Sequence, residues 1–330
     1  MKSARSAVPL VAVALVVHLA CGATTAPNEP TPAATTNAGP APAPDGFKQI
    51  GYLPSWAGSV SSVQYPYLTH INYAFALPNA GGALLPIENA SKLASLAATA
   101  HANGVRVLLS IGGWNDGNDS AFEALAASAG SRSVFVQDCL AVADRYGLDG
   151  IDIDWEYPDP GPSGARYQEL MSELCSALHA RGKLCTAAVV AQGSTAGGVP
   201  SAVFGDVDYL QIMAYDANNA DHSSYAYAES SLRYWRDRGL PATKAVLGVP
   251  FYARPSWAAY STLLAAGCAE TANSCSYQGA TNWYNGTTLI AQKRQLALAN
   301  GGGIMNWELS QDVSDARSLL RAMSGGVALR

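Results

Sequence analysis

The stretch that decides the fold is residues 149–158, Asp-Gly-Ile-Asp-Ile-Asp-Trp-Glu-Tyr-Pro. Side chains alternate between the two faces of a β-strand, so three apolar residues share one face here and three acids share the other. The acids are Asp152, Asp154 and Glu156. Neighbours on one face lie about 6.6 Å apart, and at an effective dielectric constant of about 20 two unit charges at that distance repel by about 2.5 kcal/mol. We therefore expect at least one carboxyl group to keep its proton at neutral pH, as a general acid must.

Two other interpretations of this acidic face are weaker. A solvent-exposed edge strand would rarely place two isoleucines and a tryptophan behind its acids. Divalent cations bind clustered oxygens, but they usually take ligands from several elements or from a loop with glycine at its turn. We favour a barrel strand whose inward-facing acids emerge at the C-terminal end, where catalytic groups of (β/α)8 barrels collect.

From residue 47 onward, apolar strand-like runs alternate with helical patterns, which is typical of a parallel α/β sheet. Eight strands predict one (β/α)8 TIM barrel, a single catalytic domain over residues 47–330. A doubly wound sheet is the alternative, but no Gly-rich dinucleotide fingerprint follows the first strand. No internal sequence repeat is evident. The expected strands are Lys48–Leu53, His70–Leu77, Val105–Gly112, Gly150–Trp155, Lys183–Val190, Tyr209–Ala214, Ala245–Pro250 and Gly303–Trp307.

Helical patterns occupy most of the links between these strands. The links after the first and fifth strands are the exceptions, because they look poorly helical. The expected helices are Asn89–Asn103, Ser133–Tyr146, Ala165–Arg181, Ala226–Arg238, Thr287–Asn300 and Asp315–Met323.

The N-terminal region has the composition of a targeting segment. Lys2 and Arg5 precede an apolar run over residues 7–20 that is short for a membrane span, so residues 1–21 predict a signal peptide. Cys21 then suggests a lipidated bacterial lipoprotein, although His18 stands where that pattern normally has leucine, so ordinary secretion is the alternative. Residues 22–46, rich in Ala, Pro and Thr, predict a disordered linker. We expect a protein that is secreted or anchored at the outer membrane or cell surface.

The net charge is −5, and removing residues 1–21, which contain two basic residues and no acidic ones, takes it to −7. This charge does not suggest a nucleic acid or an anionic membrane as a partner. We expect a monomer whose one possible membrane contact is a lipid on Cys21.

Cysteine usage fits export. Cys268 and Cys275 close a short polar loop and are the predicted disulfide. A second bridge would lie among Cys139, Cys175 and Cys185, with its pairing undecided. No cysteines and histidines have metal-ligand spacing, so we expect no metal and no cofactor.

Nearly every expected strand ends in an aromatic residue beside a polar one. Aromatic faces stack on sugar rings while polar groups bind hydroxyls, so this recurrence predicts a carbohydrate-binding groove. Trp307 is the strongest single candidate for a sugar platform. The candidate binding residues at the strand ends are Tyr52, Phe75, Gly113, Trp114, Met213, Tyr215, Asp216, Arg254 and Trp307.

With these motifs, residues 47 to about 323 resemble the chitinases of glycoside hydrolase family 18. Residues 149–156 match the acidic signature of that family at all four carboxylates, Asp149 included, and residues 110–114, Ser-Ile-Gly-Gly-Trp, match its third-strand motif. Residues 213–216 resemble the sixth-strand motif, and residues 303–307 with Asp312 resemble the eighth. Chitin or N-acetylglucosamine oligosaccharides are the substrates that this resemblance implies.

The resemblance also implies a role for each matching residue. Glu156 would be the acid/base, Asp154 would orient the substrate acetamido group, and Asp152 would tune Asp154. Tyr215 would bind the acetamido oxygen. Asp216 would help to position that group, and Trp307 would form the floor under the reacting sugar.

The position of the acids bears on the mechanism. A retaining glycosidase usually needs an acid and a nucleophile on opposite faces of the scissile bond, whereas Asp154 and Glu156 protrude side by side from one strand. A nucleophile supplied by the substrate removes this difficulty, because the N-acetyl carbonyl oxygen can attack the anomeric carbon and form an oxazolinium intermediate. Substrate-assisted hydrolysis with retention is therefore expected.

Two departures from the family pattern qualify the resemblance. Residues 252–254 read Tyr-Ala-Arg where many relatives have Tyr-Gly-Arg, which makes Arg254 less secure. Only 48 residues separate Arg254 from Gly303, too few for the sizeable α+β insertion of some relatives, so we expect a shallow cleft and endo-type cutting. Trp257, Trp283 and Tyr284 are possible outer platforms.

Two other functions are open. An endo-β-N-acetylglucosaminidase that cleaves the chitobiose core of N-glycans uses the same acidic signature. A lectin-like chitin-binding protein without catalysis is disfavoured, because such relatives usually replace the acid and Glu156 is intact.

Overall fold

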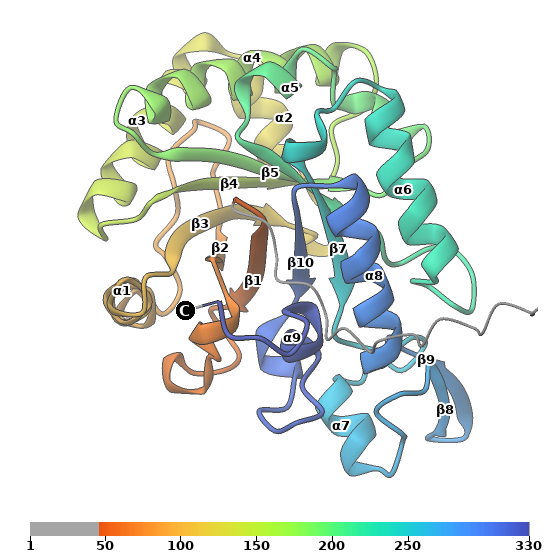
Figure 1. The fold of residues 1–330 in the computed structure, drawn as a ribbon. Helices are drawn as coiled ribbons and strands as arrows, with labels where there is room; N and C mark the ends of the chain where they lie inside the picture. Colours follow the sequence, from red (N-terminus) through yellow and green to blue (C-terminus); the bar gives the residue numbers. More distant parts are fainter. Residues whose placement is uncertain (1–45, 330) are drawn as a thin grey trace, which may run out of the picture. The chain divides into compact units, whose positions relative to one another are not determined.

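The computed structural model describes residues 46–329. The predictions for residues 1–45, which include the signal peptide, Cys21 and nearly all of the linker, lie outside this range. Eight parallel strands close into a barrel in which each strand pairs with its neighbours in chain order and β1 pairs with β10, so the predicted (β/α)8 barrel is confirmed (Figure 1). The barrel strands are β1 (Lys48–Pro54), β2 (His70–Ala76), β3 (Arg106–Gly113), β4 (Gly150–Trp155), β5 (Leu184–Val190), β6 (Tyr209–Met213), β7 (Ala245–Pro250) and β10 (Gly303–Trp307).

Helices surround this barrel on its outside (Figure 1). As expected, the links after β1 and β5 hold only 3-10 turns and, after β5, one short helix. No helix within residues 46–329 is long and apolar enough to cross a membrane. The helices are α1 (Ala90–Ala102), α2 (Ser120–Ala126), α3 (Ala129–Arg145), α4 (Pro162–His179), α5 (Val203–Asp206), α6 (Tyr225–Asp237), α7 (Tyr260–Ala265), α8 (Thr287–Asn300) and α9 (Leu319–Met323).

Three predicted helix starts were wrong. Helix α4 begins at Pro162, three residues before the predicted Ala165, because proline is tolerated in the first turn of a helix; a serine cap explains the other two differences. Helix α3 begins before Ser133 because the side chain of Ser128 accepts a hydrogen bond from a backbone amide of the first turn. Helix α9 begins after Asp315 because Ser318 is its cap, and the partly buried carboxylate of Asp312 accepts hydrogen bonds from the first two helical amides. Asp312, part of the eighth-strand motif, therefore anchors a helix.

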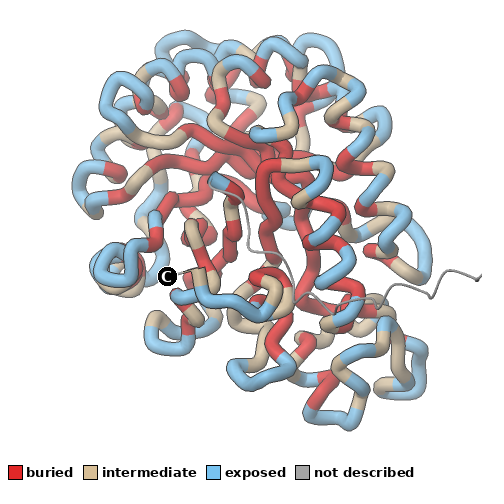
Figure 2. Tube along the Cα trace, in the orientation of Figure 1, coloured by how far each residue is buried: buried red, intermediate tan, exposed pale blue. Residues whose placement is uncertain are grey.

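The core lies on both sides of the barrel wall. The red strands and inward helix faces in Figure 2 mark the larger layer between barrel and helices, while a smaller cluster that includes Met305 and Tyr209 fills the barrel interior. On β4, Trp155 faces the helix layer and stacks on Phe122 with ring centroids 5.1 Å apart, while Asp152 on the opposite face is fully buried. The alternation predicted for β4 is therefore present, with both faces buried.

The segment between β7 and β10 contains elements that the sequence did not predict. Helix α7 is followed by a two-stranded antiparallel hairpin, β8 (Ser274–Tyr277) and β9 (Ala280–Trp283). Gln278 and Gly279 at its turn both have positive φ, as a two-residue hairpin turn requires. The predicted disulfide pair, Cys268 and Cys275, joins the chain after α7 to β8.

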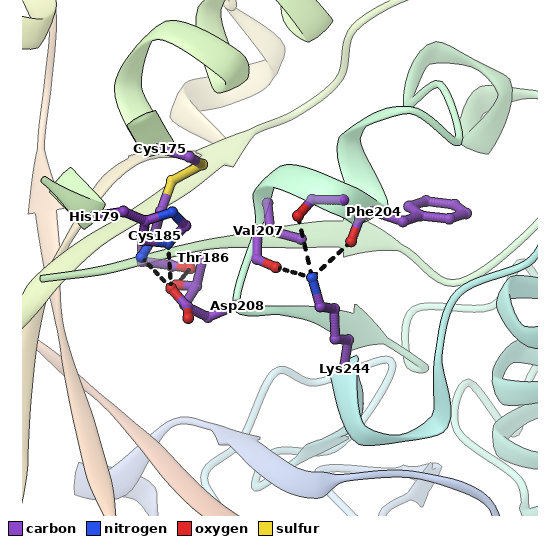
Figure 3. Close-up of a disulfide and its surroundings, with 10 residues drawn as sticks. Cys175, His179, Cys185, Thr186, Phe204, Val207, Asp208 and Lys244 are labelled. Carbon is purple, nitrogen blue, oxygen red and sulfur yellow. Dashed lines mark hydrogen bonds and ion pairs between the residues drawn. A yellow bond between two sulfur atoms is a disulfide. The ribbon is translucent and has the colours of Figure 1, made fainter. Parts of the chain in front are cut away.

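The second disulfide joins Cys175 on α4 to Cys185 on β5 (Figure 3), and Cys139 is a buried free thiol. Beside it, Asp208, which directly precedes β6, accepts a hydrogen bond from the Cys185 amide and lies 3.0 Å from Nε2 of His179. This is the N-terminal end of the barrel, where residues serve stability.

Asp149 makes the same kind of contacts before β4. Its Oδ2 accepts a hydrogen bond from the Val107 amide and lies 2.8 Å from Nε2 of His101. The Asp–His–amide arrangement thus occurs twice, two strands apart, although no sequence repeat was evident. Asp149 therefore lies at the end of the barrel away from the strand tips that carry the other acids.

Candidate active site

Asp152 is fully buried inside the barrel and accepts four hydrogen bonds. Burial raises the pKa of Asp152, and these four bonds oppose that rise by stabilising the carboxylate. The neighbouring strands supply the donors at matching register, since Ser110 and Thr186 pair directly with Asp152 in the sheet. The donors are Tyr52 Oη at 2.8 Å, Ser110 Oγ at 2.8 Å, Thr186 Oγ1 at 2.6 Å and Gln211 Nε2 at 2.7 Å.

Asp154 lies one step nearer the strand end and is differently placed. Its Oδ1 is buried and has no hydrogen-bond partner within residues 46–329. Burial, together with the charges of Glu156 and Asp152, raises the pKa of Asp154 well above its usual range. This agrees with the expectation that one acid of the ladder keeps its proton.

Glu156 follows the last residue of β4 and is partly exposed. Desolvation raises its pKa to about 7; a hydrogen bond from Tyr157 opposes this shift, and the charge of Asp216 adds to it. A carboxyl group with a pKa near neutrality can donate a proton and later accept one at physiological pH.

Tyr215 and Asp216 follow β6 on another side of the same site. Asp216 is held by two neighbours: Tyr252 Oη donates to its Oδ2 and Arg254 Nη1 donates to its Oδ1, both at 2.7 Å. Nδ1 of the buried His222 lies 3.3 Å from Oδ1 as well. Burial would raise the pKa of Asp216, but these contacts outweigh it and lower the pKa. Asp216 is therefore a fixed anion.

Aromatic rings form the floor of the site. Phe75 stacks on Trp307 at 5.5 Å between centroids with an interplanar angle of 18°, and Tyr52 and Trp56 contact Trp307 at 5.6 and 6.4 Å. Gly113 lies behind Phe75, where an added Cβ would be 2.6 Å from the ring. Gly113 therefore makes room for Phe75.

These groups line one cleft of about 570 Å³ at the C-terminal ends of the strands. Asp152 and Gly113 lie behind its surface, and Asp149 is at the opposite end of the barrel. No group of three or more histidine, cysteine or acidic side chains in the described part of the chain is arranged to hold a metal ion. The predicted residues that line the cleft are Tyr52, Phe75, Trp114, Asp154, Glu156, Met213, Tyr215, Asp216, Arg254 and Trp307.

Some lining residues were not selected from the sequence. Tyr157 directly follows Glu156, and Tyr252 lies two residues before Arg254, so their closeness to a motif could have identified both. No sequence feature pointed to Tyr227 on α6. Among the possible outer platforms, Trp257 lines the cleft. Tyr284 does not serve as one, because it is 1% exposed and its hydroxyl donates to the Ala269 carbonyl oxygen.

Comparison with known proteins places this site in a family. A model of the glycosyl hydrolases family 18 matches residues 48–312. The chain belongs to glycosyl hydrolases family 18. The family resemblance expected from the acidic strand is therefore confirmed, and the four signature carboxylates and the third-strand motif all lie within the matched range.

Proteins named as chitinases are similar to this chain. A probable endochitinase of Caenorhabditis elegans is 36% identical over 177 residues, which cover 46% of this chain and 28% of that protein. Chitinase 1 of Aphanocladium album is 30% identical over 279 residues, which cover 68% of this chain and 66% of that protein. The chain thus spans less than two thirds of the length of these two relatives.

A solved family 18 structure has the same fold. The crystal structure of the GH18 chitinase ChiB from the chitin utilization locus of Flavobacterium johnsoniae matches with a TM-score of 0.73 at 26% identity, covering 84% of this chain and 93% of that one. The barrel of this family 18 member is therefore of the same type as that of a chitinase.

Proposed function

We propose that this protein is an endo-acting chitinase that hydrolyses β-1,4-linked N-acetylglucosamine polymers or oligomers with retention. Its membership of family 18 and its similarity to proteins named as chitinases support the substrate class. The aromatic floor beside polar groups fits a sugar chain.

The state of the carboxylates carries the mechanism. Asp154, Glu156 and Asp216 are the acids that line the cleft. Asp216 has both oxygens engaged by Tyr252 and Arg254, and Asp154 and Glu156 leave the same strand. Within the described residues, the cleft therefore offers no free carboxylate opposite Glu156 to act as nucleophile. The acetamido carbonyl oxygen of the substrate takes that part.

The steps follow from these positions. Glu156 donates its proton to the glycosidic oxygen as the acetamido oxygen attacks the anomeric carbon, which gives an oxazolinium ion and the free leaving chain. Asp154, whose Oδ1 has no hydrogen-bond partner within residues 46–329, receives the acetamido N–H, and the Tyr215 hydroxyl donates to the acetamido oxygen. Glu156, now a carboxylate, removes a proton from the water that opens the intermediate.

The test is hydrolysis of chitohexaose and of fully deacetylated chitosan. Glu156→Gln should lower hydrolysis of the hexamer by about 10² to 10⁴ while leaving binding intact, and the wild type should not cut the deacetylated polymer. Efficient cleavage of that polymer would overturn the acetamido nucleophile. Preference for a high-mannose glycoprotein over the hexamer would instead support an endo-β-N-acetylglucosaminidase.

The same proposal includes location. Two disulfides are typical of an exported protein, and they support a protein that is secreted or held at the cell surface by a lipid on Cys21. Fractionation of cells that express the wild type and a Cys21→Ser variant separates these two forms, because only a lipidated protein changes from the membrane to the soluble fraction on substitution.

A further inference from the structure

Trp257 is an exposed aromatic residue of the cleft that the mechanism above does not use. It lines the cleft, and 58% of its surface is accessible. Its φ of 60° lies in the left-handed region, which a bulky residue adopts only when its surroundings enforce it. Contacts with neighbouring residues must therefore hold the Trp257 backbone in this conformation.

Two residues support the Trp257 ring. Tyr252 stacks on it with centroids 5.5 Å apart and an interplanar angle of 17°, and the guanidinium carbon of Arg254 lies 3.9 Å from its centroid. Tyr252 also contacts Tyr215 edge to face at 6.2 Å. The rings of Tyr215, Tyr252 and Trp257 thus form a continuous row that leads from the acetamido site along the cleft.

The β8–β9 hairpin fixes the backbone that carries Trp257. The amide and carbonyl of Arg254 pair with the carbonyl and amide of Trp283 on β9, at 3.0 and 2.8 Å. The amide of Ser256 donates to Oδ1 of Asn282 at 2.9 Å. The Cys268–Cys275 disulfide closes the loop that leads into this hairpin.

Asn282 is the central residue of this support. It is fully buried, and its Nδ2 donates to the carbonyl oxygens of Tyr277 and Ala280 while its Oδ1 accepts from Ser256. One amide side chain therefore joins the hairpin turn to the loop of Trp257. Loss of its Oδ1 or of its Nδ2 would leave the polar groups that it binds without a partner.

We propose that Trp257 is a stacking platform for an N-acetylglucosamine unit beyond the one over Trp307, and that Asn282 is its positioning residue. This inference rests on the proposed chitinase function and adds a second sugar site to the same cleft. The platform favours longer oligosaccharides, because only a longer chain reaches both Trp307 and Trp257.

Calorimetric binding of chitohexaose to Glu156→Gln protein tests this. Adding Trp257→Ala to the Glu156→Gln protein should raise the dissociation constant for chitohexaose about tenfold. Adding Trp257→Phe instead should retain most of the affinity. Tyr225→Ala is the matched control, since Tyr225 is an exposed aromatic residue outside the cleft lining, and it should leave binding unchanged.

Asn282→Ala should weaken binding nearly as much as Trp257→Ala, and the double variant should be no worse than either, because both changes remove one platform. Additive losses would overturn the role of Asn282, and unchanged binding in Trp257→Ala would overturn the platform. If the wild type fails to cleave chitohexaose although Glu156→Gln protein binds it through Trp257, the proposed function fails and the sugar platform stands.

Discussion

The Tyr52 hydroxyl lies 2.8 Å from Oδ2 of Asp152, a residue 100 positions further along the chain. Tyr52 thereby links β1 to β4 across the barrel interior, and its ring also contacts Trp307 at 5.6 Å. One side chain thus contacts both Asp152, the most deeply buried of the three acids, and the aromatic floor. A change at Tyr52 should therefore affect both the acids and the floor.

Tyr52→Phe should lower kcat for chitohexaose about tenfold, the size expected for one hydrogen bond to a charged group. The substitution removes one of the four bonds that hold down the pKa of Asp152, so Asp152 loses charge and supports Asp154 less well. Steady-state kinetics checks this. Tyr73→Phe is the control, because that hydroxyl binds backbone carbonyls of Glu88 and Asn89; equal losses in both variants would contradict a specific role.

The alkaline limb of the pH profile should report Glu156. Because its pKa is about 7 and the protonated form is the acid, kcat/KM should fall about tenfold between pH 6 and pH 8. The charge of Asp216 raises this pKa, so Asp216→Asn should move the limb to lower pH. Asp315→Asn, which removes an acid outside the cleft lining, should leave the limb in place. A limb at the same pH in Asp216→Asn would refute the electrostatic coupling.

Lys293 should make stability depend on pH. Its buried ammonium group donates to Ser223 and Asn285, and burial lowers its pKa to about 7. The unfolded chain keeps this proton up to about pH 10.5, so between these values the unfolded state binds more protons and stability rises with pH.

Relative to Lys293→Met, the unfolding free energy of the wild type should therefore increase from pH 7 to pH 9, by at most about 1.4 kcal/mol per pH unit. Urea denaturation at each pH measures it. Leu296→Ala, which removes an apolar side chain from the same helix, should show a constant deficit. If the difference in unfolding free energy between the wild type and Lys293→Met did not change with pH, titration of Lys293 would be excluded.

Gly113→Ala should raise KM for chitohexaose several-fold and lower the unfolding free energy by about 1–3 kcal/mol. The new methyl group would lie 2.6 Å from Phe75 and displace that ring from its stack on Trp307. Gly147→Ala is the control, since Gly147 also has positive φ but open space around it. Calorimetric melting and kinetics on both variants separate backbone strain from the displaced ring.

The sequence predicted the barrel and most of the cleft because strand alternation is local. The alternation of side chains along a strand placed Asp152 and Asp154 on one face, and the position of the aromatic residues at the ends of strands placed them at the cleft. The hydrogen-bond partners of Asp152 could not be predicted from the sequence, because Ser110 and Thr186 contact it only through the register between strands. The Cys175–Cys185 bond depends likewise on a Cα separation of 5.1 Å that spacing cannot supply.

Closure of the barrel between β1 and β10 determines how the folded protein can associate through its backbone. A sheet that closes on itself has no unpaired strand edge. Within residues 46–329, the other sheet is the two-stranded hairpin, and β9 already meets Arg254 on its outer side. Within these residues, the outer side of β8, four residues long and held by a disulfide, is therefore the edge left for strand addition. Amyloid-like stacking of the barrel strands themselves would require the barrel to open first.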